Sequence, residues 1–115
     1  MTYTDISLHQ SLGDIFPFDQ LPPPALEQLA GESQLLRYRI GQPILRRESM
    51  PYQLVAILQG RARLLGYDPA KQAPMTLDLL GPKAVLGLAS LVRGMPCEGV
   101  IASSEVEAIA IPVNA

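Results

Sequence analysis

Apolar residues along this chain come in short runs that turn residues separate. The clearest run is Gln53 to Leu58 (QLVAIL), which is almost wholly apolar and lies between Pro51 and Gly60. A run of this length is too short for a typical helix and is typical of a strand buried on both faces. The next segment, Arg61 to Tyr67, begins by alternating polar and apolar residues, which indicates a strand with one exposed face. The centre of the chain therefore predicts two consecutive strands that differ in exposure.

Proline and glycine divide the rest of the chain in the same way. The sequence has 11 prolines among 115 residues, about twice the usual ~5%. The apolar runs between the turn residues predict about eight short strands in all, and such strands at regular spacing indicate a β-sandwich or jelly roll. Besides the two central strands, we expect strands over residues 35–40, 44–48, 75–80, 85–86, 99–102 and 106–111.

Helical spacing occurs in two places. The apolar residues of Pro24 to Ala30 fall on one face at helical spacing, with Pro24 suited to the first helical position and Gly31 suited to cap the far end. A single helical turn is predicted over Leu88 to Val92, before Gly94.

The first fifteen residues are largely polar and show no periodicity. We expect them to form an N-terminal arm (1–15), ahead of one jelly-roll domain (16–112) and a short tail (113–115). A length of 115 residues accommodates one ordinary domain. A content of 48% apolar and 17% charged residues is typical of a globular protein.

Charge and cysteine content narrow the possible partners. The net charge of −2 is too small to attract a polyanion over distance, so nucleic-acid binding by this domain is not expected. The single cysteine, Cys97, excludes an internal disulfide and fits a reducing compartment, so we expect a cytoplasmic location. Residues 1–10 do not look like a signal peptide, and no apolar run approaches the ~20 residues of a membrane span. Membrane insertion is therefore not expected.

Three motifs along residues 16–112 resemble one known family, the cyclic-nucleotide-binding domains of bacterial regulators, kinase regulatory subunits and gated channels. They are Phe18-x-x-Leu21 with Leu26-x-x-Leu29 and Tyr38-x-x-Gly41-x-x-Ile44; the apolar run and Gly60 within Leu54 to Leu64; and Leu80-Gly81-Pro82 to Pro96. The resemblance implies an all-β fold: a double-stranded β-helix, or jelly-roll barrel, with short flanking helices.

By this resemblance, Leu86 to Val100 stands where the family keeps its phosphate-binding cassette. Members that bind nucleotide usually read Phe-Gly-Glu-[Leu/Ile]-Ala-Leu and then Pro-Arg-[Ala/Ser]-Ala-Thr, and this segment aligns without a gap. The family's glutamate, which holds the ribose 2′-hydroxyl, is replaced by Leu88, and its arginine, which pairs with the cyclic phosphate, is replaced by Cys97. The pocket residues that the resemblance implies are Gly87, Leu88, Ala89, Ser90, Pro96, Cys97, Glu98 and Gly99.

These replacements bear directly on binding, because a cyclic phosphate is an anion that needs a guanidinium and backbone N–H donors. Without the arginine, the charge of the phosphate would be desolvated with only partial compensation. Glu98 would add repulsion if its side chain faced the pocket, whereas the nearby Arg93 offers a substitute cation. We therefore expect no cofactor, with cAMP or cGMP bound weakly or not at all.

The function expected from these residues is a non-catalytic regulatory or interaction domain with a degenerate cassette. Family barrels are followed by lid helices, and this chain stops three residues after Pro112. We thus expect the lid to be absent and the chain to be a fragment of a larger signalling, transcriptional or transport protein with an effector domain in the same or a partner protein. The alternative is a genuine sensor that binds a small ligand in the same pocket. A homodimer is also open.

Catalytic chemistry finds little support in the sequence. The only histidine, His9, lies in the expected arm and is interpreted as a surface residue; one histidine cannot supply the two or three that cupin metal centres need. Cys97 has no histidine base within reach and Glu98 is adjacent, so a buried or unreactive thiol is favoured over a nucleophile. We therefore expect that the domain is not an enzyme.

Overall fold

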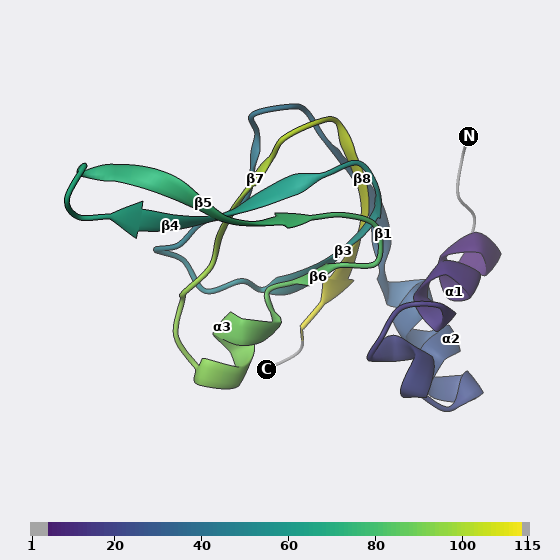
Figure 1. Cartoon of the computed structure of the whole chain (residues 1–115). Coiled ribbons are helices and arrows are strands. Elements are labelled where there is room, and N and C mark those ends of the chain that lie inside the picture. Colours follow the sequence, from purple (N-terminus) through teal and green to yellow (C-terminus); the bar gives the residue numbers. More distant parts are fainter. Residues whose placement is uncertain (1–4, 114–115) are drawn as a thin grey trace.

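Two four-stranded antiparallel sheets pack face to face in the computed structural model, which describes residues 5–113 (Figure 1). The strand orders are β1-β8-β3-β6 in the first sheet and β2-β7-β4-β5 in the second. This order is a jelly roll, so the predicted fold class is confirmed, with two separate sheets in place of a closed barrel. The strands are β1 (Gln34–Tyr38), β2 (Pro43–Leu45), β3 (Gln53–Gln59), β4 (Ala62–Asp68), β5 (Ala73–Leu80), β6 (Val85–Leu86), β7 (Gly99–Ala102) and β8 (Val106–Pro112).

Strand β3 is buried on both faces, as its apolar run predicts. Leu54 and Ala56 contribute to an apolar cluster that also contains residues of the N-terminal helices. Val55 and Ile57 contribute to a second cluster, between the two sheets. Because successive side chains of a strand point to opposite faces, only an uninterrupted apolar run can serve both clusters.

The helices are α1 (Asp5–Gly13), the 3₁₀ turn η1 (Phe18–Gln20), α2 (Pro23–Glu32) and α3 (Leu88–Arg93). The predicted helix over Pro24 to Ala30 is confirmed but extends past Gly31, which therefore is not its cap. Ser33 ends α2 instead, because its N–H donates to the Ala30 carbonyl at 3.2 Å and its hydroxyl donates to the Leu29 carbonyl at 2.8 Å. None of the helices in this described stretch is long and apolar enough to cross a membrane.

The expectation of an N-terminal arm is wrong for residues 5–15. Leu8, Leu12 and Ile15 are buried, and they belong to the cluster beneath β3 and β8. Their spacing of four and three residues is helical, but the polar residues between them obscured it. His9, interpreted as a surface residue, is half-buried on α1. Residues 1–4 of the predicted arm lie outside the described residues.

Two further predictions need correction. The second strand was expected to run on to residue 48, but β2 ends at Leu45, and Arg46 begins a turn in which its carbonyl accepts the Ser49 N–H at 3.3 Å. In the expected tail, Val113 packs against the helix-side cluster and its N–H donates to the Tyr52 carbonyl at 3.1 Å. Residues 114 and 115 lie outside the described residues.

The role of α1 in the core can be tested with Leu12→Ala. We expect this change to lower the free energy of unfolding by about 2–5 kcal/mol, because Leu12 is fully buried and its removal leaves a cavity. The matched control is Leu21→Ala, whose side chain is 36% exposed and whose loss should cost less than about 1 kcal/mol. Denaturant unfolding measures both values, and equally small losses would mean that α1 is not part of the cooperative core.

Candidate functional site

The segment between β6 and β7 forms a compact turn-helix-turn, and glycines shape both of its ends. Gly87 has φ = +103°, and a Cβ there would meet Leu54 Cδ2 at 3.2 Å. At the other end Gly94 has φ = +71°, its N–H donates to the Leu91 carbonyl at 3.3 Å, and the next N–H, of Met95, donates to the Ser90 carbonyl at 3.2 Å. Left-handed residues at such positions favour glycine. The predicted helical turn is therefore confirmed as α3.

Glu98 places its carboxylate at the start of α3. Oε2 accepts the Gly87 N–H at 3.3 Å, and Oε1 accepts the Ser90 N–H at 3.0 Å. Oε1 also accepts the Ser90 hydroxyl at 3.1 Å. Two backbone donors at the start of α3 are thus bonded to a carboxylate of the same chain.

Ser90 is the centre of this small network, and its side chain is only 2% exposed. Its hydroxyl accepts the Cys97 N–H at 3.2 Å while donating its proton to Glu98. The Cys97 Sγ lies 3.5 Å from the same oxygen. Since the one hydroxyl proton is used for Glu98, the thiol acts as the donor in that contact. Cys97 is therefore held within the network.

The side chains at this site satisfy one another without any added group. Among residues whose side chains are described, no buried side-chain nitrogen or oxygen lacks a partner. A carboxylate beside free helical N–H groups is also favoured electrostatically. An incoming anion would have to displace Glu98 from these donors and would meet a negative charge as it did so.

Comparison with known proteins identifies the fold. No protein-family model matches the chain, and no curated protein matches it. Among solved structures, the regulatory domain of Toxoplasma gondii PKA with cAMP has a TM-score of 0.84 at 15% identity, over 94% of this chain and 42% of that one. The regulatory subunit of a cAMP-independent protein kinase A from Trypanosoma brucei has a TM-score of 0.85 at 19% identity, over 94% of this chain and 40% of that one.

A shorter protein matches over nearly its whole length. The cyclic nucleotide-binding-like protein from Brucella abortus has a TM-score of 0.74 at 26% identity, covering 90% of this chain and 89% of that one. In fold, the chain is a cyclic-nucleotide-binding-like domain. It spans about two fifths of the kinase subunits. Related structures include a triple mutant of the T. brucei subunit bound to cAMP and the Trypanosoma cruzi subunit bound to guanosine.

The domain brings together only half of the predicted pocket residues. Gly87, Ser90, Cys97 and Glu98 form the network. The other four are placed differently: Leu88 packs against the helix-side cluster, Ala89 is exposed, Pro96 is half-buried, and a Cβ at Gly99 would face Arg47 and Leu65 on the outer face of the second sheet. No comparison tests whether any of these residues binds a ligand, so that role stays a prediction.

Two details of the cassette could not be assigned from the sequence. Arg93, considered as a substitute cation, is exposed in the last turn of α3. Ser90 was an implied pocket residue, but its role as the buried acceptor and donor that joins Glu98 to Cys97 depends on the turn after α3. A serine in this short helix, followed by an acidic residue just after its turn, is the signal that could have indicated such a network. Among the side chains that the structure describes, those of residues 8–113, no group of three or more His, Cys, Asp or Glu residues could hold a metal ion.

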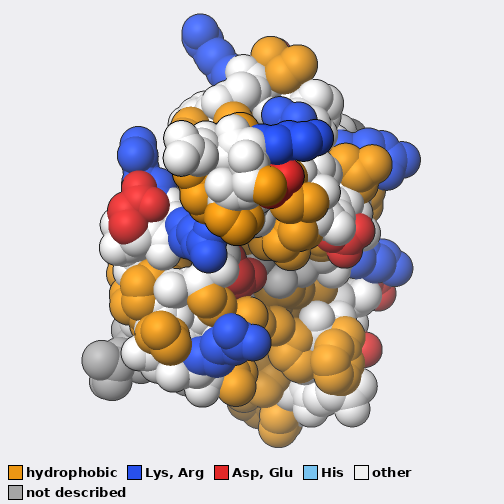
Figure 2. Space-filling model, turned by 60° about the vertical axis from the view of Figure 1, so that its left-hand side comes forward, with side chains coloured by type: hydrophobic (Ala, Val, Ile, Leu, Met, Phe, Trp, Pro, Cys, Tyr) orange, Lys and Arg blue, Asp and Glu red, His pale blue; other side chains and the backbone are white. Residues whose placement is uncertain are grey.

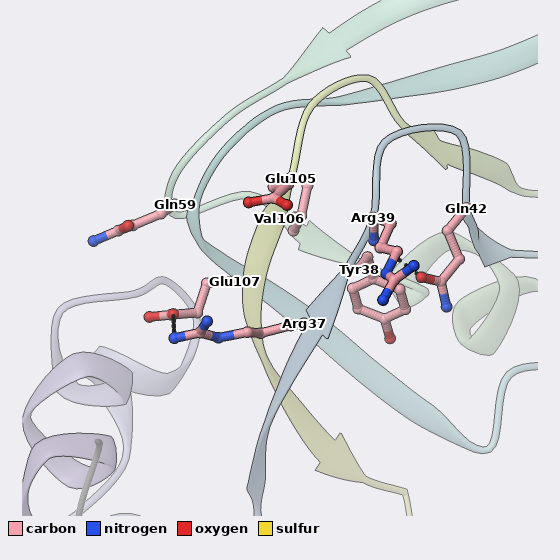
Figure 3. A pocket seen from close by; sticks show the side chains of 8 residues that line it. All are labelled: Arg37, Tyr38, Arg39, Gln42, Gln59, Glu105, Val106 and Glu107. Atoms are coloured by element: carbon pink, nitrogen blue, oxygen red, sulfur yellow. Dashed lines mark hydrogen bonds and ion pairs between the residues drawn. The ribbon is translucent and has the colours of Figure 1, made fainter. Parts of the chain in front are cut away.

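A concave region of about 530 Å³ lies outside the cassette, where the turn after β1 meets the turn before β8 (Figure 3). Its charges balance, because two arginines, Arg37 and Arg39, and two glutamates, Glu105 and Glu107, line it. Arg37 and Glu107 form an ion pair at 3.2 Å. The Arg37 side chain is 70% exposed, and exposed pairs contribute at most about 1 kcal/mol. This groove therefore favours neither an anion nor a cation.

The cassette network predicts a measurable stability difference between two variants. We expect Glu98→Ala to lower the free energy of unfolding by about 1–3 kcal/mol, because the buried Ser90 hydroxyl and two N–H groups lose their acceptor. Glu98→Gln keeps one carbonyl oxygen and should lose less. Denaturant unfolding compares the three proteins, and an alanine variant as stable as the parent would show that the network adds nothing to the fold.

Tyr38 gives the domain a pH dependence at alkaline pH. Burial raises the pKa of the Tyr38 hydroxyl above its usual value of 10.0, and neighbouring Tyr52 raises it further. The folded state therefore keeps this proton to higher pH than the unfolded state, so stability falls as pH rises above about 10. We expect Tyr38→Phe to reduce that fall, as measured by denaturant unfolding from pH 8 to 11. Identical slopes for the two proteins would exclude Tyr38 as its source.

Proposed function

We propose that this domain is a non-catalytic regulatory or interaction module whose cassette is closed by its own carboxylate and does not bind cyclic nucleotide in the usual way. The observation that carries the proposal is the position of the Glu98 carboxylate, which accepts hydrogen bonds from the N–H groups of Gly87 and Ser90. In the family that the sequence resembles, backbone donors at this position and an arginine hold the phosphate. Here two of the backbone donors, the N–H groups of Gly87 and Ser90, bind Glu98, and Cys97 replaces the arginine.

The energetics favour the tethered carboxylate over an external phosphate. Glu98 pays no entropy of association, whereas a free ligand does. Hydrogen bonds to charged groups contribute roughly 1.5–3 kcal/mol each, so the missing arginine alone weakens affinity by roughly tenfold or more. Displacing Glu98 would also remove the acceptor of the buried Ser90 hydroxyl.

The comparisons support this interpretation in two ways. The T. brucei subunit is described as cAMP-independent, and its triple mutant, one of whose changes introduces an arginine, is bound to cAMP. The kinase subunits, of which the chain covers about two fifths, are examples of larger proteins that include such a fold, and we propose the same setting here, in the cytoplasm because the single cysteine fits a reducing compartment. Its effector, in the same or a partner protein, would be a DNA-binding domain, a kinase or channel unit, or a membrane transporter.

A second candidate function is a sensor of an uncharged small ligand in the same pocket. The T. cruzi subunit bound to guanosine favours it, because a nucleoside has no phosphate to compete with Glu98. Such a ligand would leave the hydrogen bonds of Glu98 in place.

The decisive experiment restores the arginine with and without Glu98. Calorimetric titration with cAMP and cGMP should show no saturable binding for the parent domain or for Cys97→Arg, because the new guanidinium can pair with Glu98. The double variant Cys97→Arg/Glu98→Ala should instead show saturable binding, which corresponds to an affinity at least roughly tenfold above the limit that bounds Cys97→Arg. Cys97→Arg/Glu105→Ala removes an exposed glutamate elsewhere and should behave like Cys97→Arg.

Other results separate the alternatives. Saturable micromolar binding of either nucleotide to the parent would overturn the closed-cassette proposal. Equal binding by Cys97→Arg and its Glu98→Ala double variant would show that Glu98 does not block the site. Saturable binding of guanosine alone would favour the sensor. Thermal unfolding of each variant confirms that it is folded before titration.

A further inference from the structure

A groove of about 350 Å³ lies on the outer face of the second sheet, and Gly99 and Val100, the last residues of the cassette segment, form part of its lining. Leu65 of β4 and Ile101 of β7 line it, between Pro43 and Pro74. The neighbouring residues Leu64 and Val100 belong to the core between the sheets, so the strand alternation directs Leu65 and Ile101 outward. The domain thus carries an apolar concavity on a face that its core does not use. Figure 2 views the molecule from the end of the β4–β5 hairpin, where hydrophobic side chains are seen among charged ones.

Gly99 helps to leave this groove open. It pairs with Leu65 across β7 and β4. A Cβ at Gly99 would lie 3.6 Å from Arg47 Cβ and 4.0 Å from Leu65 Cβ, which are ordinary contact distances. A side chain would therefore fit there and fill part of the hollow. Glycine within a strand often marks a place where another group approaches closely.

Two arginines stand at the rim of the groove. Arg46 and Arg47 follow β2 in the turn that ends that strand early, and both are exposed. Among residues 8–113, whose side chains are described, the one ion pair is that of Arg37 with Glu107, and it involves neither rim arginine. With Glu48 also at the rim, the local charge is about +1. An apolar floor beside a rim of net positive charge is complementary to a molecule with an apolar body and one anionic group.

We propose that this groove binds a medium-chain carboxylate, with its hydrocarbon tail over Leu65 and Ile101 and its carboxylate at Arg46 and Arg47. At about 30 Å³ for a water-sized atom, the volume accommodates roughly a dozen non-hydrogen atoms. The site is distinct from the Glu98 network and does not rest on the proposed function, because a side chain at Gly99 would face the groove while Glu98 bonds the start of α3.

The test titrates octanoate into the 115-residue chain and follows backbone amide shifts by NMR. We expect saturable shifts at Leu65, Gly99 and Ile101, none at Ser90, and weaker binding at high salt. 1-Octanol, which lacks the charge, should bind less tightly. The double change Arg46→Gln/Arg47→Gln should weaken octanoate binding by about fivefold for each arginine, the upper end for exposed ion pairs, whereas the control Arg39→Gln should leave it unchanged.

A second, independent test fills the groove with a side chain. Gly99→Val should abolish the shifts while thermal unfolding shows an intact fold; if valine is not tolerated, Gly99→Ala should still weaken binding. The proposal is overturned if octanoate gives no saturable shifts, if shifts centre on Ser90, or if the arginine and Gly99 variants bind as well as the parent.

Discussion

The antiparallel pair of β3 and β8 is the interaction on which the rest of this structure depends. Both strands lie in the middle of one sheet, and their alternate side chains supply two separate apolar clusters. One cluster holds the second sheet against the first, and the other holds α1 and α2. Because each strand must be apolar on both faces, few polar residues are tolerated there. The polar and charged residues are consequently concentrated in the turns, in the cassette and on the outer faces of the sheets.

Much of this architecture could be predicted from local patterns. The run from Gln53 to Leu58, the turn at Gly60 and the helical spacing after Pro24 each depend on neighbouring residues alone. The N-terminal helix was missed because three buried residues among polar ones resemble an arm until the surface that they cover is known. Similarly, Arg46 to Glu48 directly follow the apolar residues of β2, and no turn residue in the sequence separates them from that strand. Only the pairing with β7 shows that β2 ends at Leu45.

The candidate site shows where sequence reasoning reaches its limit. The replacement of the expected arginine by Cys97 was visible from alignment to a family pattern, and so was the possibility that Glu98 opposes an anion. The direction of the Glu98 side chain was not, because it depends on the left-handed turns at Gly87 and Gly94 and on the burial of Ser90. A substitution pattern can show that a binding residue is missing. It does not show that another residue has taken over the vacated hydrogen bonds.

The cassette and the N-terminal helices share a mechanical connection. Leu88 and Leu91 of α3 pack against the same cluster that contains Leu12 of α1 and Leu26 of α2. Protein interiors are densely packed and transmit displacement rather than absorbing it. The α1–α2 pair lies beside the first sheet in Figure 1, and the cluster that fixes its position is the one that receives α3. The packing of the N-terminal helices and the packing of the cassette helix are therefore not separate problems, because a change in the shape of this cluster alters the surface that both contact.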